Sequence, residues 1–170
     1  METRADLAND GSGSFTEGDK VGLYLQGDKG LSYRELTYSG GQWIPRLKRN
    51  DFGEGPLSLS AHYPATGEQQ NPETYQLNMA LDQTGDDFYN SDLLFSKTVV
   101  ESGVYKADMN FGHALHRIRI FLSGSMTSPE VKVRSLTQGY FNLLTGEAEV
   151  RGTDFRWITP SKDGEGNFAA

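Results

Sequence analysis

Hydrophobic and polar residues alternate along much of this 170-residue chain. Val21, Leu23 and Leu25 fall on one side of an extended backbone, and Leu57–Tyr63 repeats the pattern. A period of two is the signature of strands that are buried on one face. About eight strands are therefore expected, in segments 20–25, 31–38, 57–63, 104–122, 131–136, 140–143, 148–150 and 155–159.

The segment 104–122 carries the strongest strand signal together with an internal conflict. Met109 and Phe111 occupy odd positions, whereas the two isoleucines that follow occupy even ones. One continuous strand cannot direct both sets to the same face, because a slip of one residue exchanges the faces. We expect either a bulge or short turn near 112–115, or two separate strands.

The stretch 75–96 gives a mixed pattern. Its first residues alternate, but 91–95 fits either a capped helical turn or a short buried strand. Twenty glycines and six prolines favour frequent turns and short strands over long helices. Together these features predict an all-β fold, an antiparallel β-sandwich with at most a short helical turn.

The two ends of the chain are polar, and the length fits one domain. Residues 1–14 are expected to form a flexible leader, and residues 15–160 the domain itself. Residues 161–170 are rich in glycine and charge, which is typical of a tail or the start of a linker.

Composition excludes several classes of protein. The net charge of −7 argues against nucleic-acid binding, which needs concentrated lysine and arginine. The absence of cysteine excludes disulfides, thiol nucleophiles and cysteine-based zinc sites. No apolar run approaches the roughly 20 residues that span a bilayer, and residues 1–10 lack the apolar core of a signal peptide. An exported form would therefore have lost its signal.

Candidate chemistry is sparse. The three histidines His62, His113 and His116 lack metal-ligand spacing, and a structural role is favoured for them. A second candidate is a group of four aspartates, which faintly resembles a calcium loop without the EF-hand order, so a solvated acidic turn is favoured. The group consists of Asp82, Asp86, Asp87 and Asp92.

No catalytic constellation or cofactor motif is present: the chain has no GxSxG elbow, P-loop or GxGxxG. The sequence therefore predicts no enzyme and no cofactor. Tyr33, Tyr38 and Trp43 are candidates for a sugar-stacking platform, although aromatic residues at such spacing are more often core or cross-strand pairs.

Five phrases, in order along 15–150, resemble the fimbrillin-like family of Bacteroidales surface proteins. The phrases are Phe15–Tyr24, Trp43 with Pro56–Pro64, Asp92–Ser96, Phe111–Ile120 and Leu136–Gly146. The resemblance implies a transthyretin-like β-sandwich, export as an outer-membrane lipoprotein, and assembly into fimbriae by strand exchange. It also implies removal of a first strand by an Arg-directed protease, for which Arg4 and Arg34 are the upstream candidates.

The chain departs from the family pattern in two respects. It has no lipoprotein cysteine, so any lipid anchor lies outside it, and it stops where family members usually continue into a second sandwich. The resemblance therefore suggests the N-terminal domain of a structural fimbrial subunit, with other fimbrial subunits as partners. The alternative is a surface adhesin or glycan-binding module that does not polymerise.

Overall fold

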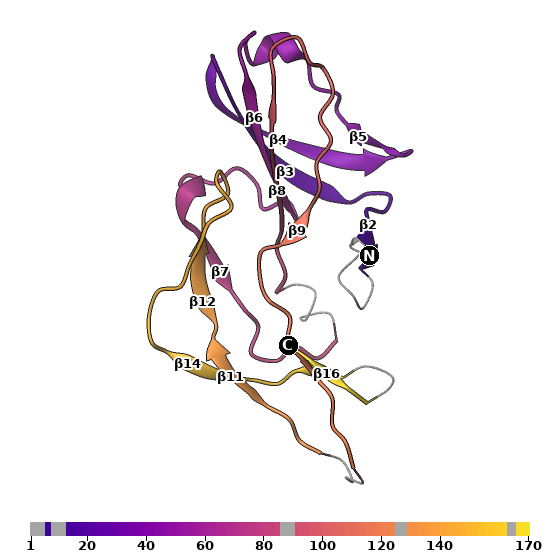
Figure 1. Ribbon diagram of the computed structural model, residues 1–170, viewed down its shortest axis with the longest axis vertical. Coiled ribbons are helices and arrows are strands. Elements are labelled where there is room, and N and C mark those ends of the chain that lie inside the picture. The colour runs from indigo at the N-terminus through magenta and orange to yellow at the C-terminus, as the bar shows by residue number, and fades with distance from the viewer. Residues whose placement is uncertain (1–5, 8–12, 86–90, 125–128, 163–165) are drawn as a thin grey trace. The chain divides into compact units, whose positions relative to one another are not determined.

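The computed structural model describes residues 6–7, 13–85, 91–124, 129–162 and 166–170 (Figure 1). Every sheet in this part of the chain is antiparallel, and the only helical elements are two 3-10 turns, Arg49–Asp51 and Pro72–Thr74. The predicted all-β, antiparallel class is therefore confirmed. Within the described residues the strand segments number sixteen, more than the expected eight, because several are only two residues long.

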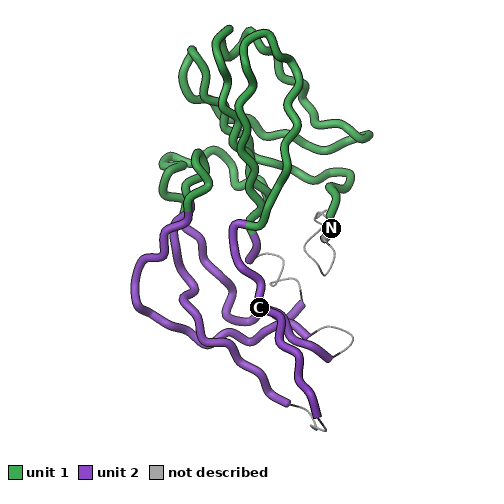
Figure 2. Tube along the Cα trace, viewed as in Figure 1, with its two compact units in different colours: residues 1–75, 93–113, 142–147 green, residues 76–92, 114–141, 148–170 purple. Residues whose placement is uncertain are grey.

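The chain divides into two compact units that alternate along the sequence (Figure 2). The first unit contains residues 1–75, 93–113 and 142–147. The second contains residues 76–92, 114–141 and 148–170. The expected single domain over 15–160 stays a prediction.

The first unit is built on a six-stranded sheet in the order β5-β4-β3-β6-β8-β9. Its strands are β3 (Lys20–Gly27), β4 (Gly30–Ser39), β5 (Gln42–Ile44), β6 (Leu57–Tyr63), β8 (Leu94–Val100) and β9 (Gly112–His113). The strands β3, β4 and β6 correspond to the predicted strands 20–25, 31–38 and 57–63, and β8 begins within the stretch whose pattern was mixed. A short N-terminal ribbon joins β1 (Asp6–Leu7) to β2 (Gly13–Ser14).

Alternation places the core of this unit on one face of the sheet. Leu23 of β3 pairs with Ala61 of β6, and Leu25 pairs with Leu59, so that apolar side chains stack across neighbouring strands. All four are at least 93% buried. Loops rather than a second hydrogen-bonded sheet supply the residues that pack on this core in the described chain, among them Phe15, Leu47, Met109 and Phe111.

The second unit consists of small sheets. Their strands are β7 (Tyr75–Asn78), which begins at the boundary, β10 (Arg119–Ile120), β11 (Val133–Leu136), β12 (Gln138–Phe141), β13 (Ala148–Glu149), β14 (Phe155–Ile158), β15 (Ser161–Lys162) and β16 (Phe168–Ala169). They pair as β10-β16-β15, β11-β14 and β13-β12-β7. The predicted hairpin is confirmed, since Tyr140 pairs with Glu149 and Phe141 with Ala148.

The segment 104–122 contains much less strand than its pattern predicts. Its strands are β9 and β10, next to which Ile118 exchanges two backbone hydrogen bonds with Ala170. The chain passes from the first unit to the second between His113 and Ala114. The expected interruption near 112–115 is thus present, in the form of two separate strands. Ile118 and Leu122 are 47% and 40% exposed, so these two even-numbered residues do not lie in a core.

The ambiguous stretch 91–95 is resolved in favour of a short buried strand. Leu93 and Leu94 are 3% and 6% exposed, and β8 begins at Leu94. Its partner strand is β6, where Tyr63 lies opposite Leu94.

Candidate functional site

The outer edge of β8 is the most unusual feature of the first unit. β6 pairs with β8 along its whole length, from Tyr63 opposite Leu94 to Leu57 opposite Val100. On the other side, β9 pairs only with Leu94 and Phe95. Within the described residues, Ser96–Val100 therefore has no strand along its outer edge.

The chain that could cover this edge runs elsewhere. Leu94 pairs with His113, and Phe95 pairs with Gly112. If this register continued by one residue, Phe111 would lie opposite Ser96. Phe111 and Met109 do pack against the buried cluster on the core face, but within the described residues no ladder joins their segment to β8. Figure 1 shows this segment leaving the sheet as a long connection above β9.

The connection 105–111 leaves its own backbone unpaired. Val104 N–H donates to the Glu101 carbonyl at 3.1 Å, but no backbone hydrogen bond joins 105–111 to other described residues. Tyr105 is 82% exposed. Within the described residues, this segment and the β8 edge therefore present two rows of backbone donors and acceptors that have no backbone partner.

An aromatic cluster flanks this region on the core face. The ring of Phe15 lies 5.1 Å from Phe111, 5.0 Å from Trp43 and 5.4 Å from Tyr63, each edge-on. Such edge-to-face contacts are the favoured geometry for aromatic pairs. The Phe111 side chain is thus held on the core face of the sheet by an aromatic contact.

Asp19 holds the backbone next to Phe15 in place through hydrogen bonds. Its carboxylate is 1% exposed and accepts hydrogen bonds from Thr16 N–H at 2.6 Å and Tyr63 Oη at 3.1 Å. These bonds offset the cost of burying a carboxylate.

The opposite face of the sheet carries a second ring cluster. His62 is 0% exposed and stacks on Tyr24 and Tyr33, with centroid distances of 6.0 and 6.3 Å. Its Nε2 lies 3.0 Å from Thr66 Oγ1, and its Nδ1 has no partner among the described residues. Burial lowers the pKa of His62 to about 4, because the cationic form loses its hydration.

Residues from loops make hydrogen bonds to this cluster and to the strand beside it. Gln69 N–H donates to Tyr24 Oη at 2.9 Å, and Ser60 Oγ donates to the Leu144 carbonyl at 2.9 Å. Burial, with Glu35 nearby, raises the pKa of Tyr33 to about 12. The cluster is therefore a packed, uncharged layer at neutral pH.

The structure separates the three predicted ligand residues. Tyr38 and Trp43 are cross-strand neighbours with ring centroids 5.1 Å apart, whereas Tyr33 lies on the opposite face of β4 with Tyr24 and His62. They do not form one platform. Whether any of them binds a ligand stays a prediction.

A more exposed aromatic pair was missed by the sequence reasoning. Phe155 and Trp157 on β14 are 49% and 61% exposed. Their alternation was read only as a strand, and nothing in a short period-two pattern tells which face is solvated.

The histidines and aspartates were the remaining candidates, as metal ligands. Within the described residues, no three or more possible metal ligands come together. Asp82 accepts from Thr84 N–H at 3.0 Å and Thr84 Oγ1 at 2.7 Å, while Asp86 and Asp87 lie outside the described residues. His113 and His116 are exposed. In the part of the chain that the structure describes, no helix has the length and hydrophobicity to cross a membrane.

Solved structures share this fold. A "putative cell adhesion protein" from Bacteroides uniformis matches with a TM-score of 0.68 and 20% identity, covering 91% of this chain and 68% of that one. A second from Bacteroides ovatus has a TM-score of 0.64 and 19% identity, covering 98% and 73%. A fimbrial protein from Bacteroides ovatus has a TM-score of 0.57 and 16% identity, covering 95% and 38%.

No curated protein matches the chain. The model of one protein family, described as fimbrillin-like, matches residues 3–169, which is nearly the whole sequence. The chain therefore belongs to the fimbrillin-like family.

Proposed function

We propose that this chain is a structural fimbrial subunit, or the N-terminal domain of one, that joins other fimbrial subunits by strand exchange at the outer edge of β8. Membership of the fimbrillin-like family supports a fimbrial or adhesion role, and proteins of this kind are structural rather than enzymatic. The observation that carries the strand-exchange step is the unpaired edge Ser96–Val100 beside the unpaired connection 105–111.

A strand from a neighbour would satisfy the backbone groups on both sides. Each added residue pair supplies N–H and C=O partners that this chain lacks at the edge, which is the physical basis of recognition by strand addition. The adjacent core contributes as well, because Val100 and Leu94 are buried at the two ends of β8 and Met109 lies only partly covered.

This proposal predicts that proline at Thr98 and proline at Val99 will affect the stability of the fold differently. Alternate residues of a strand direct their N–H groups to opposite sides, so one of these prolines breaks the ladder to β6 and the other removes a donor only from the outer edge. Thermal denaturation identifies the variant that keeps near-normal stability. That variant should lose assembly with fimbrial subunits, measured by negative-stain microscopy and by sizing of the polymers.

The more damaging proline serves as the control for a general loss of folding. Assembly of the stable proline variant at the wild-type rate and length would count against β8 as the acceptor edge.

Surface location and architecture complete the proposal. The protein would be exported and held at the outer membrane through a lipid anchor outside this chain, with a transthyretin-like sandwich spanning about 15–160. The family match supports these expectations at the coarser level of an extracellular, cell-surface protein. The alternative, a surface adhesin that does not polymerise, predicts that the purified full-length protein never assembles with fimbrial subunits.

A further inference from the structure

The two-stranded ribbon of β11 and β14 presents an aromatic ridge, defined as Phe155 and Trp157. Both residues are on β14, two positions apart, so their side chains lie on the same face of the ribbon. Their exposed fractions of 49% and 61% are high for such large apolar groups in the described chain. An exposed, contiguous aromatic surface is a common mark of a binding site.

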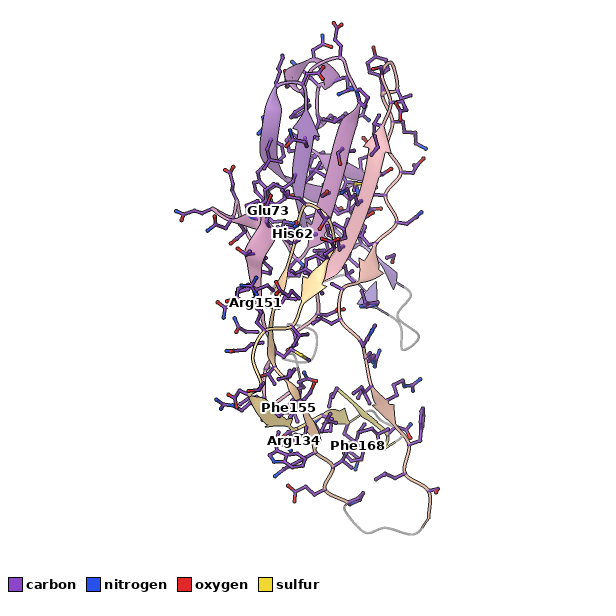
Figure 3. All side chains as sticks on the ribbon, turned by 60° about the vertical axis from the view of Figure 1, so that its left-hand side comes forward. His62, Glu73, Arg134, Arg151, Phe155 and Phe168 are labelled. Atoms are coloured by element: carbon purple, nitrogen blue, oxygen red, sulfur yellow. The ribbon has the colours of Figure 1, made fainter. Side chains whose placement is uncertain are left out.

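Polar groups of both signs border the ridge. A hollow of about 410 Å³ is lined by Trp157 together with Glu130 and Lys132. The carboxylate and the ammonium group are 2.8 Å apart, and their side chains are 78% and 49% exposed. At the other end the Arg134 guanidinium lies 5.4 Å from the centre of the Phe155 ring (Figure 3).

We propose that the aromatic ridge binds a glycan, with a neutral pyranose ring stacked on Trp157. The apolar C–H face of a pyranose matches the indole face, and the hollow has room for one or two sugar rings. Vicinal hydroxyl groups each act as donor and acceptor, so Glu130 accepts from one hydroxyl while Lys132 donates to its neighbour. The ridge continues to Phe155, where a second sugar unit reaches the Arg134 guanidinium.

The chemistry of the border favours a neutral sugar over other occupants. An apolar protein surface would bury the ion pair of Glu130 and Lys132 without compensating hydrogen bonds, which carries a large desolvation cost. A polyanion would compete with Glu130 for Lys132 and would approach a chain of net charge −7. A neutral, hydroxyl-rich ligand satisfies both charges at once. This inference goes beyond the fimbrial role and does not depend on assembly.

The experiment is a glycan array carrying immobilised neutral and acidic oligosaccharides, probed with the whole protein and then with variants. Binding to neutral pyranose oligosaccharides is expected, and it should weaken at least tenfold in Trp157→Ala and clearly in Glu130→Gln. Phe121→Ala is the matched control, since Phe121 is 63% exposed in the same unit but is not part of the β11–β14 ribbon, and it should bind like the wild type.

Fluorescence gives a second readout on the best array oligosaccharide. Trp43→Phe leaves Trp157 as the only tryptophan, and its emission should shift to shorter wavelength during titration. Three results would overturn the proposal: no binding to any glycan, binding that survives Trp157→Ala, or a preference for acidic glycans that Glu130→Gln strengthens. A concentration-dependent emission shift without glycan would assign the ridge to self-association instead. Circular dichroism of Trp157→Ala checks that the variant is folded.

Discussion

Replacing Gly22 with alanine should destabilise the protein by about 3 kcal/mol, the upper end of the range for overpacking a core. A Cβ at this position would lie 2.3 Å from His62 Cε1 and 2.7 Å from Tyr33 Oη. Real Cβ atoms do not approach other atoms so closely, and His62 has no room to retreat because it is fully buried against the rings of Tyr24 and Tyr33. Chemical denaturation of the wild type and the variant measures the difference.

Two controls separate this clash from a general effect of removing a strand glycine. At Gly112 an added Cβ meets no atom within 4 Å, so Gly112→Ala should leave stability nearly unchanged. In a His62→Ala background the two nearest atoms are gone and the Tyr33 hydroxyl is the close neighbour that remains, so Gly22→Ala should cost less there than in the wild type. Equal costs in both backgrounds would show that the two residues are not in contact.

Acidification should remove about 3 kcal/mol of stability through His62 alone. The pKa of this histidine is lowered from about 6.5 in the unfolded chain to about 4 in the folded protein, because burial penalises its charged form. Between these two values the unfolded state binds a proton that the folded state does not, so the free energy of unfolding falls as the pH falls from 6.5 to 4. Above pH 6.5 the contribution is fully present.

Denaturation curves at several pH values, for the wild type and His62→Gln, isolate this term. The variant should lose the pH dependence between 6.5 and 4.5, a window above the range in which the exposed Glu17 and Asp82, whose pKa values are lowered by hydrogen bonds, take up protons. His116→Gln, which changes an exposed histidine, should behave like the wild type. A pH dependence that is the same in wild type and His62→Gln would refute the assignment.

The sequence predicted those parts of the fold in which alternation continues for a whole strand. Leu57–Tyr63 places four apolar residues on one face, and Lys20–Leu25 places three. Both strands lie at the centre of the sheet. Alternation fails in 104–122 because a period of two reports which residues can share a face, and not whether a neighbouring strand exists to pair with them. Met109 and Phe111 have the right pattern and pack against the buried cluster, yet within the described residues their segment has no strand partner.

The candidate site could not be predicted from the sequence for a related reason. An uncovered edge results from the path of a connection, and no residue type in 105–111 marks that path. Tyr33, Tyr38 and Trp43 looked equivalent as aromatics, yet the parity of β4 sends Tyr33 to one face and Tyr38 to the other. His62 was expected to be structural, but its complete burial depends on loops far away in sequence, such as the one that contains Leu144.

Residue-resolved amide hydrogen exchange, before and after mixing with other fimbrial subunits, tests the acceptor edge most directly. In the isolated chain, alternate amides of Ser96–Val100 should be protected by β6, while the intervening amides and those of 105–111 exchange rapidly. After assembly the intervening amides of Ser96–Val100 should become protected as well. Rapid exchange that persists at these amides in the assembled fimbria would contradict strand addition at β8.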